Sequence, residues 1–595
     1  MTELLIVMVV ALVVIAGATL VGPRLGVASP LVLVAIGVVA SLVVPAFSSV
    51  EIGPELILLG ILPPLLYSAA VSLPTMNFRR EFGAISGLSV ALVVGTSLIL
   101  GLFFTLVIPG LGLAWGVALG AIISPTDAVA ASIVKQAPVS KRVVAMLDGE
   151  SLLNDATALT LLRAAIVATA ASFSFWGVVA SFTYSVVAAL LIGGAVGWLN
   201  LEVRKRITDP TVNTALSFTV PFVAAIPAEL VGASGLVAAV VAGLVTGVRA
   251  ARVLSPQNRV SDSQNWRMIE LVLEGGIFLL MGLQISSILT DVENDDAGIK
   301  AALLIAVGAL VITVVVRVAF VAPLLAVLSH RSRRHAKMKP RMQVIQDRLT
   351  TPQEILDAPE HPSGLTPTKS ARYVERVTSL VTRSLADIDY FLREPLGWRE
   401  GTTVVWAGMR GAITVAAAQS LPIDTPLRST LVLIAFVVAA LSLLVQGGTI
   451  GALVRRISPA VDEAVQDERA TVERTRLFAL LKASAATVPA PAVLGDEVEV
   501  GAAKVGAVEV GVVDGNQLDG GDYAAAGSND ADDYAPRRAR FEADKLHRLA
   551  VIGAQRTALL DARDNGIFDA DVLENALDNL DATQITLEMR GKSAV

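Results

Sequence analysis

The chain has 595 residues, of which 54% are hydrophobic and 17% are charged, and its mean hydropathy is +0.66. Soluble globular chains contain roughly 45–50% apolar and about 25% charged residues, so this composition excludes a soluble enzyme, a disordered scaffold and a disulfide-rich secreted protein. The chain has no Cys, which excludes thiol chemistry and cysteine-bound metal. The formal net charge is −6, and residues 460–595 alone carry −11. Neither part of the chain has the basic excess typical of a nucleic-acid binder.

Apolar runs recur along residues 1–459 and reach the length of about 20 residues with which an α-helix crosses a bilayer. They predict an all-α polytopic membrane protein with about 13 transmembrane helices and a soluble C-terminal tail. The expected spans are 3–21, 30–47, 52–72, 83–108, 112–133, 142–170, 174–201, 211–231, 233–249, 266–289, 299–328, 401–420 and 427–454.

The basic residues of the connecting loops predict the orientation of these helices. The odd-numbered connections contain twelve Lys and Arg residues before the cluster at 331–341 is counted, whereas the even-numbered connections contain Lys300 and Arg428. Loops rich in Lys and Arg stay in the cytoplasm. We therefore expect a multi-pass protein of the cell (plasma) membrane with its N-terminus outside and its C-terminus in the cytoplasm.

Two parts lie outside the apolar runs. The cytoplasmic loop 329–400 begins basic, becomes Pro-rich and then has apolar residues at helical spacing, which predicts an amphipathic helix on the membrane or on the inner face of the protein. The acidic tail 460–595 follows the transmembrane domain 1–459 and has helical patterns at 463–483 and 537–590, around a flexible linker at 484–536. We expect this tail to be regulatory and to dock on the basic inner loops; the alternative is a solvated appendage.

Ionisable side chains inside apolar spans are costly and therefore indicate a functional site. Here they gather in a few spans: Asp127 in the fifth, Glu150 and Asp155 in the sixth, and Glu229, Glu274, Arg317 and Arg410 in later spans. An unpaired buried charge is very costly, so we expect the two arginines to neutralise Glu150, Asp127 or Glu274. Glu229, near an outer span end, is open to three interpretations: a gate, a coupling group or an interfacial side chain.

The sixth span carries the richest polar pattern. Ser151 and Asp155 lie one helical turn apart, and Asn154 directly precedes the aspartate. A carboxylate flanked by hydroxyl and amide oxygens suits a hard monovalent cation such as Na+. The alternative is a set of buried polar groups that only tie helices together.

Two spans contain helix-breaking sequences at membrane depth. In the fifth, Pro125 removes a backbone donor next to Thr126 and Asp127, and in the twelfth two glycines flank Arg410. The two spans are seven apart and so run in opposite directions. Two broken helices in inverted-topology repeats are typical of alternating-access carriers.

Four motifs in this order resemble the monovalent cation:proton antiporter-1 family of NhaP-like and Na+/H+-exchanger-type carriers. They are SPTDAVA (124–130), GESLLNDATAL (149–159), WAGMRGAITVA (406–416) and VQGGTIGALVRR (445–456). The resemblance covers about residues 1–460 and implies a dimeric, 13-helix inverted-repeat antiporter. It also implies that Asp155 binds cation and proton in competition, and that Thr126, Asp127, Ser151 and Asn154 line that site.

Two features depart from the family pattern. Tyr67 and Ser68 follow LPPLL, where many members supply an acidic residue. The loop 329–400 is also longer than the family's usual inner loop.

One buried carboxylate can serve both substrates, because burial disfavours its ionised form unless a cation accompanies it. Asn154 is neutral, so the site has one titrating carboxylate, which predicts electroneutral exchange of one cation for one proton. We therefore expect a secondary transporter rather than an enzyme, with Na+ or K+ and H+ as substrates, no cofactor, and a role in pH and sodium homeostasis. A cation channel and a non-transporting membrane sensor with a regulatory tail remain as alternatives.

Overall fold

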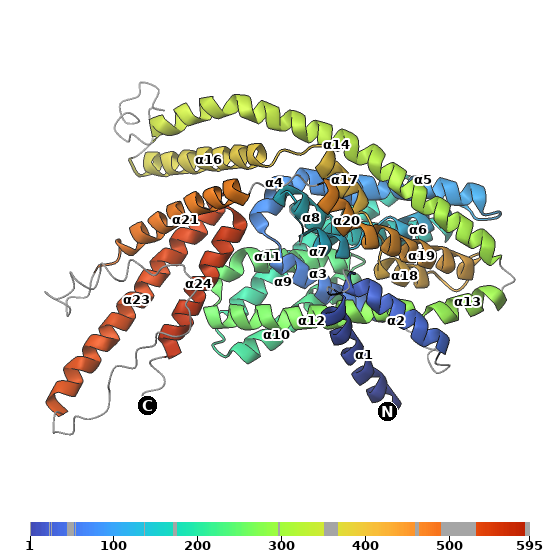
Figure 1. The fold of residues 1–595 in the computed structure, drawn as a ribbon, viewed down its shortest axis with the longest axis horizontal. Helices are drawn as coiled ribbons and strands as arrows, with labels where there is room; N and C mark the ends of the chain where they lie inside the picture. The colour runs from blue at the N-terminus through green and yellow to red at the C-terminus, as the bar shows by residue number, and fades with distance from the viewer. Residues whose placement is uncertain are drawn as a thin grey trace. The chain divides into compact units, whose positions relative to one another are not determined.

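The structure is a computed structural model, and it describes residues 2–22, 24, 27–43, 53, 55–135, 137, 139–170, 175–294, 298–349, 367–457, 463–489 and 531–589. Within these ranges all regular secondary structure is helical, as the sequence predicts (Figure 1). The chain divides into two compact units, Met1–Val461 and Asp462–Val595.

Each predicted span of the first unit coincides with one helix or with consecutive helical segments. The first segments are α1 (Thr2–Val21), α2 (Ser29–Val43), η3 (Leu56–Ile61), α3 (Leu62–Ser72), α4 (Thr75–Ser86), η4 (Gly87–Leu92), α5 (Val93–Val107), α6 (Leu113–Ile123), α7 (Val129–Lys135) and α8 (Lys141–Ala170). They are followed by α9 (Phe175–Arg204), α10 (Pro210–Leu230), α11 (Gly235–Val253), α12 (Pro256–Leu283) and α13 (Ile285–Asn294). The last are α14 (Ile299–Leu349), α16 (Pro367–Arg393), α17 (Trp398–Trp406), α18 (Ala412–Gln419), α19 (Arg428–Ser442), η5 (Leu443–Gly447) and α20 (Gly448–Ile457).

Eight helical segments of the described chain are long and apolar enough to cross a membrane, and four shorter apolar helices accompany them. The chain is therefore a polytopic helical membrane protein. The total of about 13 crossings stays a prediction, because the remaining spans are short or interrupted.

Both predicted helix breaks are present. The fifth span is divided into α6, which ends at Ile123, and α7, which begins at Val129. The twelfth is divided into α17, which ends at Trp406, and α18, which begins at Ala412. Pro125 lies in the first break and removes a backbone donor there. Each break leaves several backbone groups without helical partners inside an apolar span.

Small residues allow α6 to approach its neighbour α5 at backbone distance. A Cβ built on Gly116 would meet the carbonyl oxygen of Gly101, and one built on Gly120 would meet that of Ser97. Such contacts between small residues are a common way to pack helices inside a membrane. They hold α6, and with it the first break, against α5.

The loop predicted at 329–400 contains a helical hairpin. α14 continues beyond the apolar span to Leu349, and α16 returns alongside it (Figure 1). Val381, Leu385 and Ile388 of α16 are buried, and Lys339 of α14 pairs with Asp389 of α16 at 2.6 Å. The predicted amphipathic helix is therefore α16, and it packs against α14.

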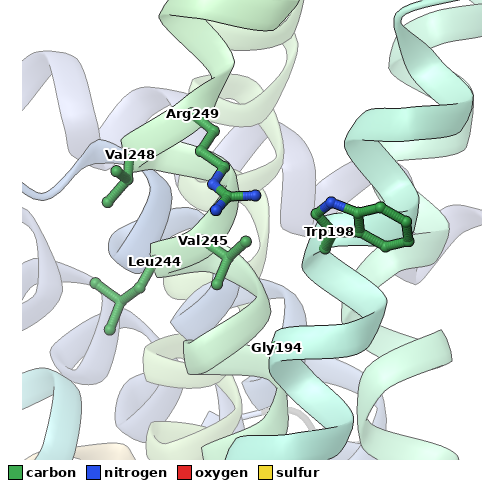
Figure 2. Close-up of a pocket in the computed structure, with 6 residues that line it drawn as sticks. All are labelled: Gly194, Trp198, Leu244, Val245, Val248 and Arg249. Atoms are coloured by element: carbon green, nitrogen blue, oxygen red, sulfur yellow. The ribbon is translucent and has the colours of Figure 1, made fainter. Parts of the chain in front are cut away.

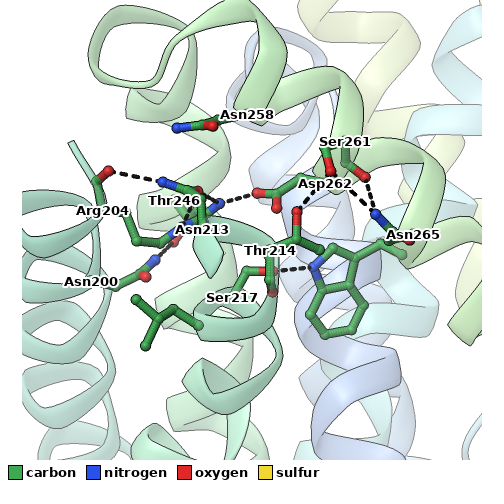
Figure 3. Close-up of polar contacts among 12 residues, drawn as sticks. Asn200, Arg204, Asn213, Thr214, Ser217, Thr246, Asn258, Ser261, Asp262 and Asn265 are labelled. Atoms are coloured by element: carbon green, nitrogen blue, oxygen red, sulfur yellow. Dashed lines mark hydrogen bonds and ion pairs between the residues drawn. The ribbon is translucent and has the colours of Figure 1, made fainter. Parts of the chain in front are cut away.

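A buried polar network joins the ends of α9, α10 and α12 (Figure 3). Arg204 is 1% exposed; its Nε and Nη2 donate to Oδ1 of Asn213 at 2.8 and 2.6 Å, and it pairs with Asp262. Nε1 of Trp266 donates to the Ser217 hydroxyl at 3.0 Å. In the sequence analysis Arg204 counts as a loop residue that indicates the cytoplasmic side. In the structure it is buried and holds helices together.

The described residues of the second unit form α21 (Glu463–Ala485), α23 (Ala531–Asn565) and α24 (Ala570–Met589). Nε2 of Gln555 donates to the carbonyl of Leu481 at 3.3 Å, and Arg556 pairs with Asp581 at 2.6 Å. The helical patterns at 463–483 and 537–590 thus coincide with helices, the second divided by a turn at Gly566 with φ +69°. Most of the predicted linker 484–536 lies outside the described residues.

Replacement of Arg204 by Ala should strongly destabilise the protein, because it leaves the Asp262 carboxylate without its counter-charge. Removing one partner of a buried pair lowers the free energy of unfolding by about 3–5 kcal/mol. Thermal unfolding in detergent measures this effect. The matched control is Arg206→Ala, since that side chain is 75% exposed and its loss should change stability by about 0.5 kcal/mol or less. Equal melting temperatures for the two variants would contradict the structural role of Arg204.

Candidate cation and proton site

The two helix breaks touch each other. The backbone N–H of Asp127 donates to the carbonyl of Met409 at 2.7 Å, which links the first break to the second. A Cβ built on Gly411 would overlap Oδ2 of Asp127. The second break therefore needs a residue without a side chain at this position, because the carboxylate occupies the space.

Asp127 lies where two half-helices begin. Its Oδ1 accepts a hydrogen bond from the N–H of Val129, the first residue of α7, at 2.9 Å. Its other oxygen lies against Gly411, which directly precedes α18. The N-terminal end of a helix carries partial positive charge, so the carboxylate stabilises the starts of α7 and α18.

Arg410 lies where two half-helices end. Its Nε donates to the carbonyl of Ile123, the last residue of α6, at 3.0 Å, and its Nη1 donates to the carbonyl of Gly408, just beyond α17. Its backbone N–H donates to the hydroxyl of Ser442 at 2.9 Å. Helix C-terminal ends carry partial negative charge, and the guanidinium compensates it. The expected pairing of Arg410 with a carboxylate is not found among the described residues; two of its guanidinium nitrogens donate to carbonyls at the breaks instead.

Glu150 and Arg317 form a buried ion pair between α8 and α14. The two Nη atoms of Arg317 lie 2.5 and 2.8 Å from the carboxylate oxygens, and the side chains are 1% and 2% exposed. Nε of Arg317 donates to the carbonyl of Val404 in α17 at 3.0 Å. Glu150 is one of the partners that the sequence predicts for Arg317. The pair ties three helices together around the crossing.

Thr126 and Asn154 connect the first break to α8. The Thr126 hydroxyl donates to Oε1 of Glu150 at 3.0 Å and accepts from Nδ2 of Asn154 at 2.8 Å. Nδ2 of Asn154 also donates to the Thr126 carbonyl at 3.0 Å. The amide nitrogen of Asn154 thus supplies a hydrogen bond to a backbone carbonyl that the helix break leaves free. Its Oδ1 is buried and has no hydrogen-bond donor in the described structure.

Asp155 differs from every other charge in this cluster. Its residue is 4% exposed, yet its carboxylate has no hydrogen bond or ion pair to any described residue. The charged side chain that acts on it is a second carboxylate, Asp127. A buried carboxylate without a counter-charge is very costly. The site is therefore suited to a carboxylate that holds either a proton or a cation.

The remaining predicted site residues lie outside this hydrogen-bonded network. Ser151 turns its hydroxyl to the carbonyl of Asp148 in its own helix at 3.1 Å. Glu229 pairs with Arg163 at 2.9 and 3.1 Å and accepts from the N–H of Gly235. Glu274 of α12 has no ion pair among the described residues, and of the three carboxylates that the sequence offers to Arg317 the structure selects Glu150.

A further buried pair, Glu81 with Arg142, escapes prediction from the sequence. Both side chains are 1% exposed, and Nε of Arg142 lies 2.5 Å from Oε1 of Glu81. Arg142 counts as a loop charge in the topology pattern, which hides its burial. The available signal is the single acid that directly follows Arg79 and Arg80 in an otherwise basic connection.

One cavity, of about 360 Å³, opens between α9 and α11 (Figure 2). Its lining is apolar apart from Arg249, and it includes Trp198 and the bare backbone of Gly194. None of these residues belongs to the cluster around Asp155. The cavity is therefore distinct from the candidate ion site.

Two interrupted helices that contact each other beside a buried carboxylate are typical of membrane carriers for ions, and the comparison with known families agrees. Residues 8–345 and 374–456 match the family described as "Sodium/hydrogen exchanger, transmembrane". The chain belongs to this family of sodium/hydrogen exchangers, as its motifs indicate. It is accordingly a transporter and not an enzyme.

Individual relatives are similar over different lengths. An uncharacterised Na+/H+ exchanger of Mycobacterium tuberculosis (strain ATCC 25618 / H37Rv) is 27% identical over 593 residues, which cover 98% of this chain and 96% of the relative. The sodium, potassium, lithium and rubidium/H+ antiporter of Bacillus subtilis (strain 168) is 30% identical over 277 residues, 45% of this chain and 41% of the relative. The solved structure of the sodium proton antiporter MjNhaP1 from Methanocaldococcus jannaschii covers 77% of this chain and 99% of its own, with a TM-score of 0.53 and 14% identity. This last likeness concerns the fold alone.

Replacement of Gly411 by Ala should displace the Asp127 carboxylate from the crossing, because the new Cβ needs its space. Overpacking of a tight contact typically costs about 1–3 kcal/mol, and we expect the loss of cation-driven proton flux to exceed the loss of stability. Gly194→Ala is the control, since a Cβ at that position meets nothing within 4 Å. Wild-type flux in reconstituted Gly411→Ala would show that the crossing tolerates a side chain and would contradict this geometry.

Proposed function

We propose that this protein is a secondary active antiporter that exchanges Na+, or another monovalent cation, for H+ by alternating access. Cation and proton compete for Asp155. The observation that carries the proposal is the carboxylate of Asp155, buried beside the crossing of two broken helices and without a partner among the described residues. Family membership and the activity of the Bacillus subtilis relative support the same substrates.

The charges around Asp155 explain why the competition falls on this residue. Glu150 is neutralised by Arg317, while Asp127 and Arg410 are engaged by the ends of the half-helices. Among the carboxylates of the cluster, Asp155 is the one that has neither a hydrogen bond nor an ion pair to a described residue. A proton removes its negative charge and a cation balances it, so either substrate satisfies the site and the two exclude each other.

The neighbouring oxygens fit a cation that prefers hard ligands. Oδ1 of Asn154 is buried and has no donor in the described structure, and the Ser151 oxygen retains acceptor capacity beside its own hydrogen bond. Asn154 is neutral, so α8 places no second carboxylate beside Asp155, and the other carboxylate of the site, Asp127, is bonded to the start of α7. We therefore propose electroneutral exchange, one cation for one proton.

Packing supports a movement of one helix group against another. The ion cluster draws on α6, α7, α8, α14, α17 and α18. Buried residues of α3, α9, α10, α11 and α12 form a second hydrophobic core, although α3, α11 and α12 also contribute residues to the first. We propose that the two groups are built from inverted repeats and that the second serves as a scaffold. Rocking of one group against the other then exposes Asp155 to the two sides in turn.

Contacts between loops support the predicted topology. Nη1 of Arg142 donates to the carbonyl of Glu394 at 3.1 Å, and Nδ2 of Asn258 donates to that of Ile207 at 3.0 Å. Each contact joins two connections that the charge pattern assigns to the same side. With the positive-inside rule, we propose that this side is cytoplasmic, with the N-terminus outside and the tail inside.

The wider roles follow from the same proposal. As a Na+/H+ antiporter of the cell membrane, the protein would serve cytoplasmic pH and sodium homeostasis. We propose a homodimer on the resemblance to dimeric family members, and a regulatory role for the acidic tail on its charge.

Asp155→Asn should abolish exchange without unfolding the protein, because an amide cannot carry the transported proton. Proton flux driven by added Na+ in proteoliposomes measures the effect. Asp148→Asn is the matched control: it removes a carboxylate from the same helix, but one that already has a partner, Lys135 at 3.0 Å. We expect that control to retain exchange. Substantial Na+-driven proton flux through Asp155→Asn would refute the assignment, and Na+ flux without proton flux through the wild type would indicate a channel.

A further inference from the structure

Arg142, the second residue of α8, is enclosed by two other elements. Nε and Nη2 lie 2.5 and 3.4 Å from the oxygens of Glu81 in α4. Nη1 donates to the carbonyl of Glu394, just beyond α16, and the ring of Phe391 lies 4.8 Å from the guanidinium carbon. One guanidinium thus joins α4, α8 and the end of α16.

The neighbouring Arg80 makes a second set of contacts to α16. Its Nε lies 2.6 Å from Oδ1 of Asp387, and its guanidinium carbon lies 4.7 Å from the centre of the Tyr390 ring. Cation–π contacts strengthen as the cation is desolvated. Burial raises the pKa of the Tyr390 phenol, so this ring stays neutral beside the charges. α4 therefore contacts α16 through Arg80 and α8 through Glu81.

These contacts reach the ion site through close packing of α4 and η4 on α8. A Cβ built on Gly149 would overlap the Ile85 side chain, and the Ser89 hydroxyl donates to the carbonyl of Glu150 at 3.3 Å. Glu150 lies one turn before Asn154 and Asp155. A change in the alignment of α4 and α8 at Arg142 would therefore alter the backbone that positions Asp155.

We propose that the base of the α14–α16 hairpin, formed by Asp387, Tyr390, Phe391 and Glu394, is a positioning element for the ion site. By enclosing Glu81 and Arg142 it fixes the ends of α4 and α8 against each other and thereby sets the cation affinity of Asp155. This inference rests on the proposed exchange function. Lys339 and Asp389 tie α16 to α14, so the hairpin transmits its own position to the ion-binding helix.

The test compares three variants at neighbouring positions of α16. Phe391→Ala removes the ring over Arg142, Phe391→Tyr keeps a ring there, and Leu392→Ala changes an exposed side chain next to it. We expect Phe391→Ala to change the KM for Na+ about two- to thirtyfold, the range of coupling through packed networks, with a smaller change in maximal rate. Phe391→Tyr and Leu392→Ala should retain the wild-type KM.

A second measurement separates this inference from the proposed function. Hydrogen exchange of the backbone amides in 143–157 should quicken in Phe391→Ala and remain at the wild-type rate in Leu392→Ala. If Phe391→Ala lowers the melting temperature but leaves both KM and this exchange unchanged, the hairpin base is merely structural and the inference fails. If the wild type shows no Na+-driven proton flux, the proposed function fails, and the amide exchange alone decides whether α16 positions α8.

Discussion

The interruption of two helices inside the membrane is the constraint on which the site depends. A bilayer offers no water to the N–H and C=O groups that a break releases, so protein groups must satisfy them. Asp127 accepts a hydrogen bond from the N–H at the start of a half-helix, and Arg410 donates to carbonyls at the ends of half-helices. Asn154 donates to the Thr126 carbonyl. The polar residues of this region are therefore needed first to make broken backbone tolerable in an apolar span.

The same arrangement leaves one carboxylate of the cluster, Asp155, without a partner among the described residues. Once the breaks have engaged Asp127 and Arg410, and Arg317 has paired with Glu150, the cluster has no fixed cation for Asp155. The low dielectric constant of the site makes the missing counter-charge more costly, because the attraction between opposite charges grows as water is excluded. In the proposed exchange, Na+ or H+ completes the charge balance that the protein leaves incomplete, so a single carboxylate would bind each of them in turn.

Much of this organisation is readable from the sequence, because Pro125 and the glycines around Arg410 break helices by local rules. It is also predictable that Arg317 pairs with a carboxylate of an apolar span, since a buried charge needs a partner, but the sequence leaves Glu150, Asp127 and Glu274 as alternatives. The role of Arg410 is not predictable, because its acceptors are main-chain carbonyls that only the crossing brings together. The burial of Arg142 and Arg204 is not predictable for a related reason. A basic residue near a loop is expected to be solvated, and only the tertiary structure shows which helix covers it. Glu274 is one of three carboxylates that the sequence offers to the arginines, and it makes no ion pair with a described residue, because Arg317 pairs with Glu150 instead.

The most direct test of the central claim is a count of the protons released when Na+ is added to purified protein in weak buffer. If Asp155 is shared, the wild type should release protons in proportion to the Na+ that it binds, and the Asp155→Asn variant should release none. Asp148→Asn should behave as the wild type does. Binding of Na+ by the wild type without proton release, or unchanged release from Asp155→Asn, would contradict competition at this carboxylate.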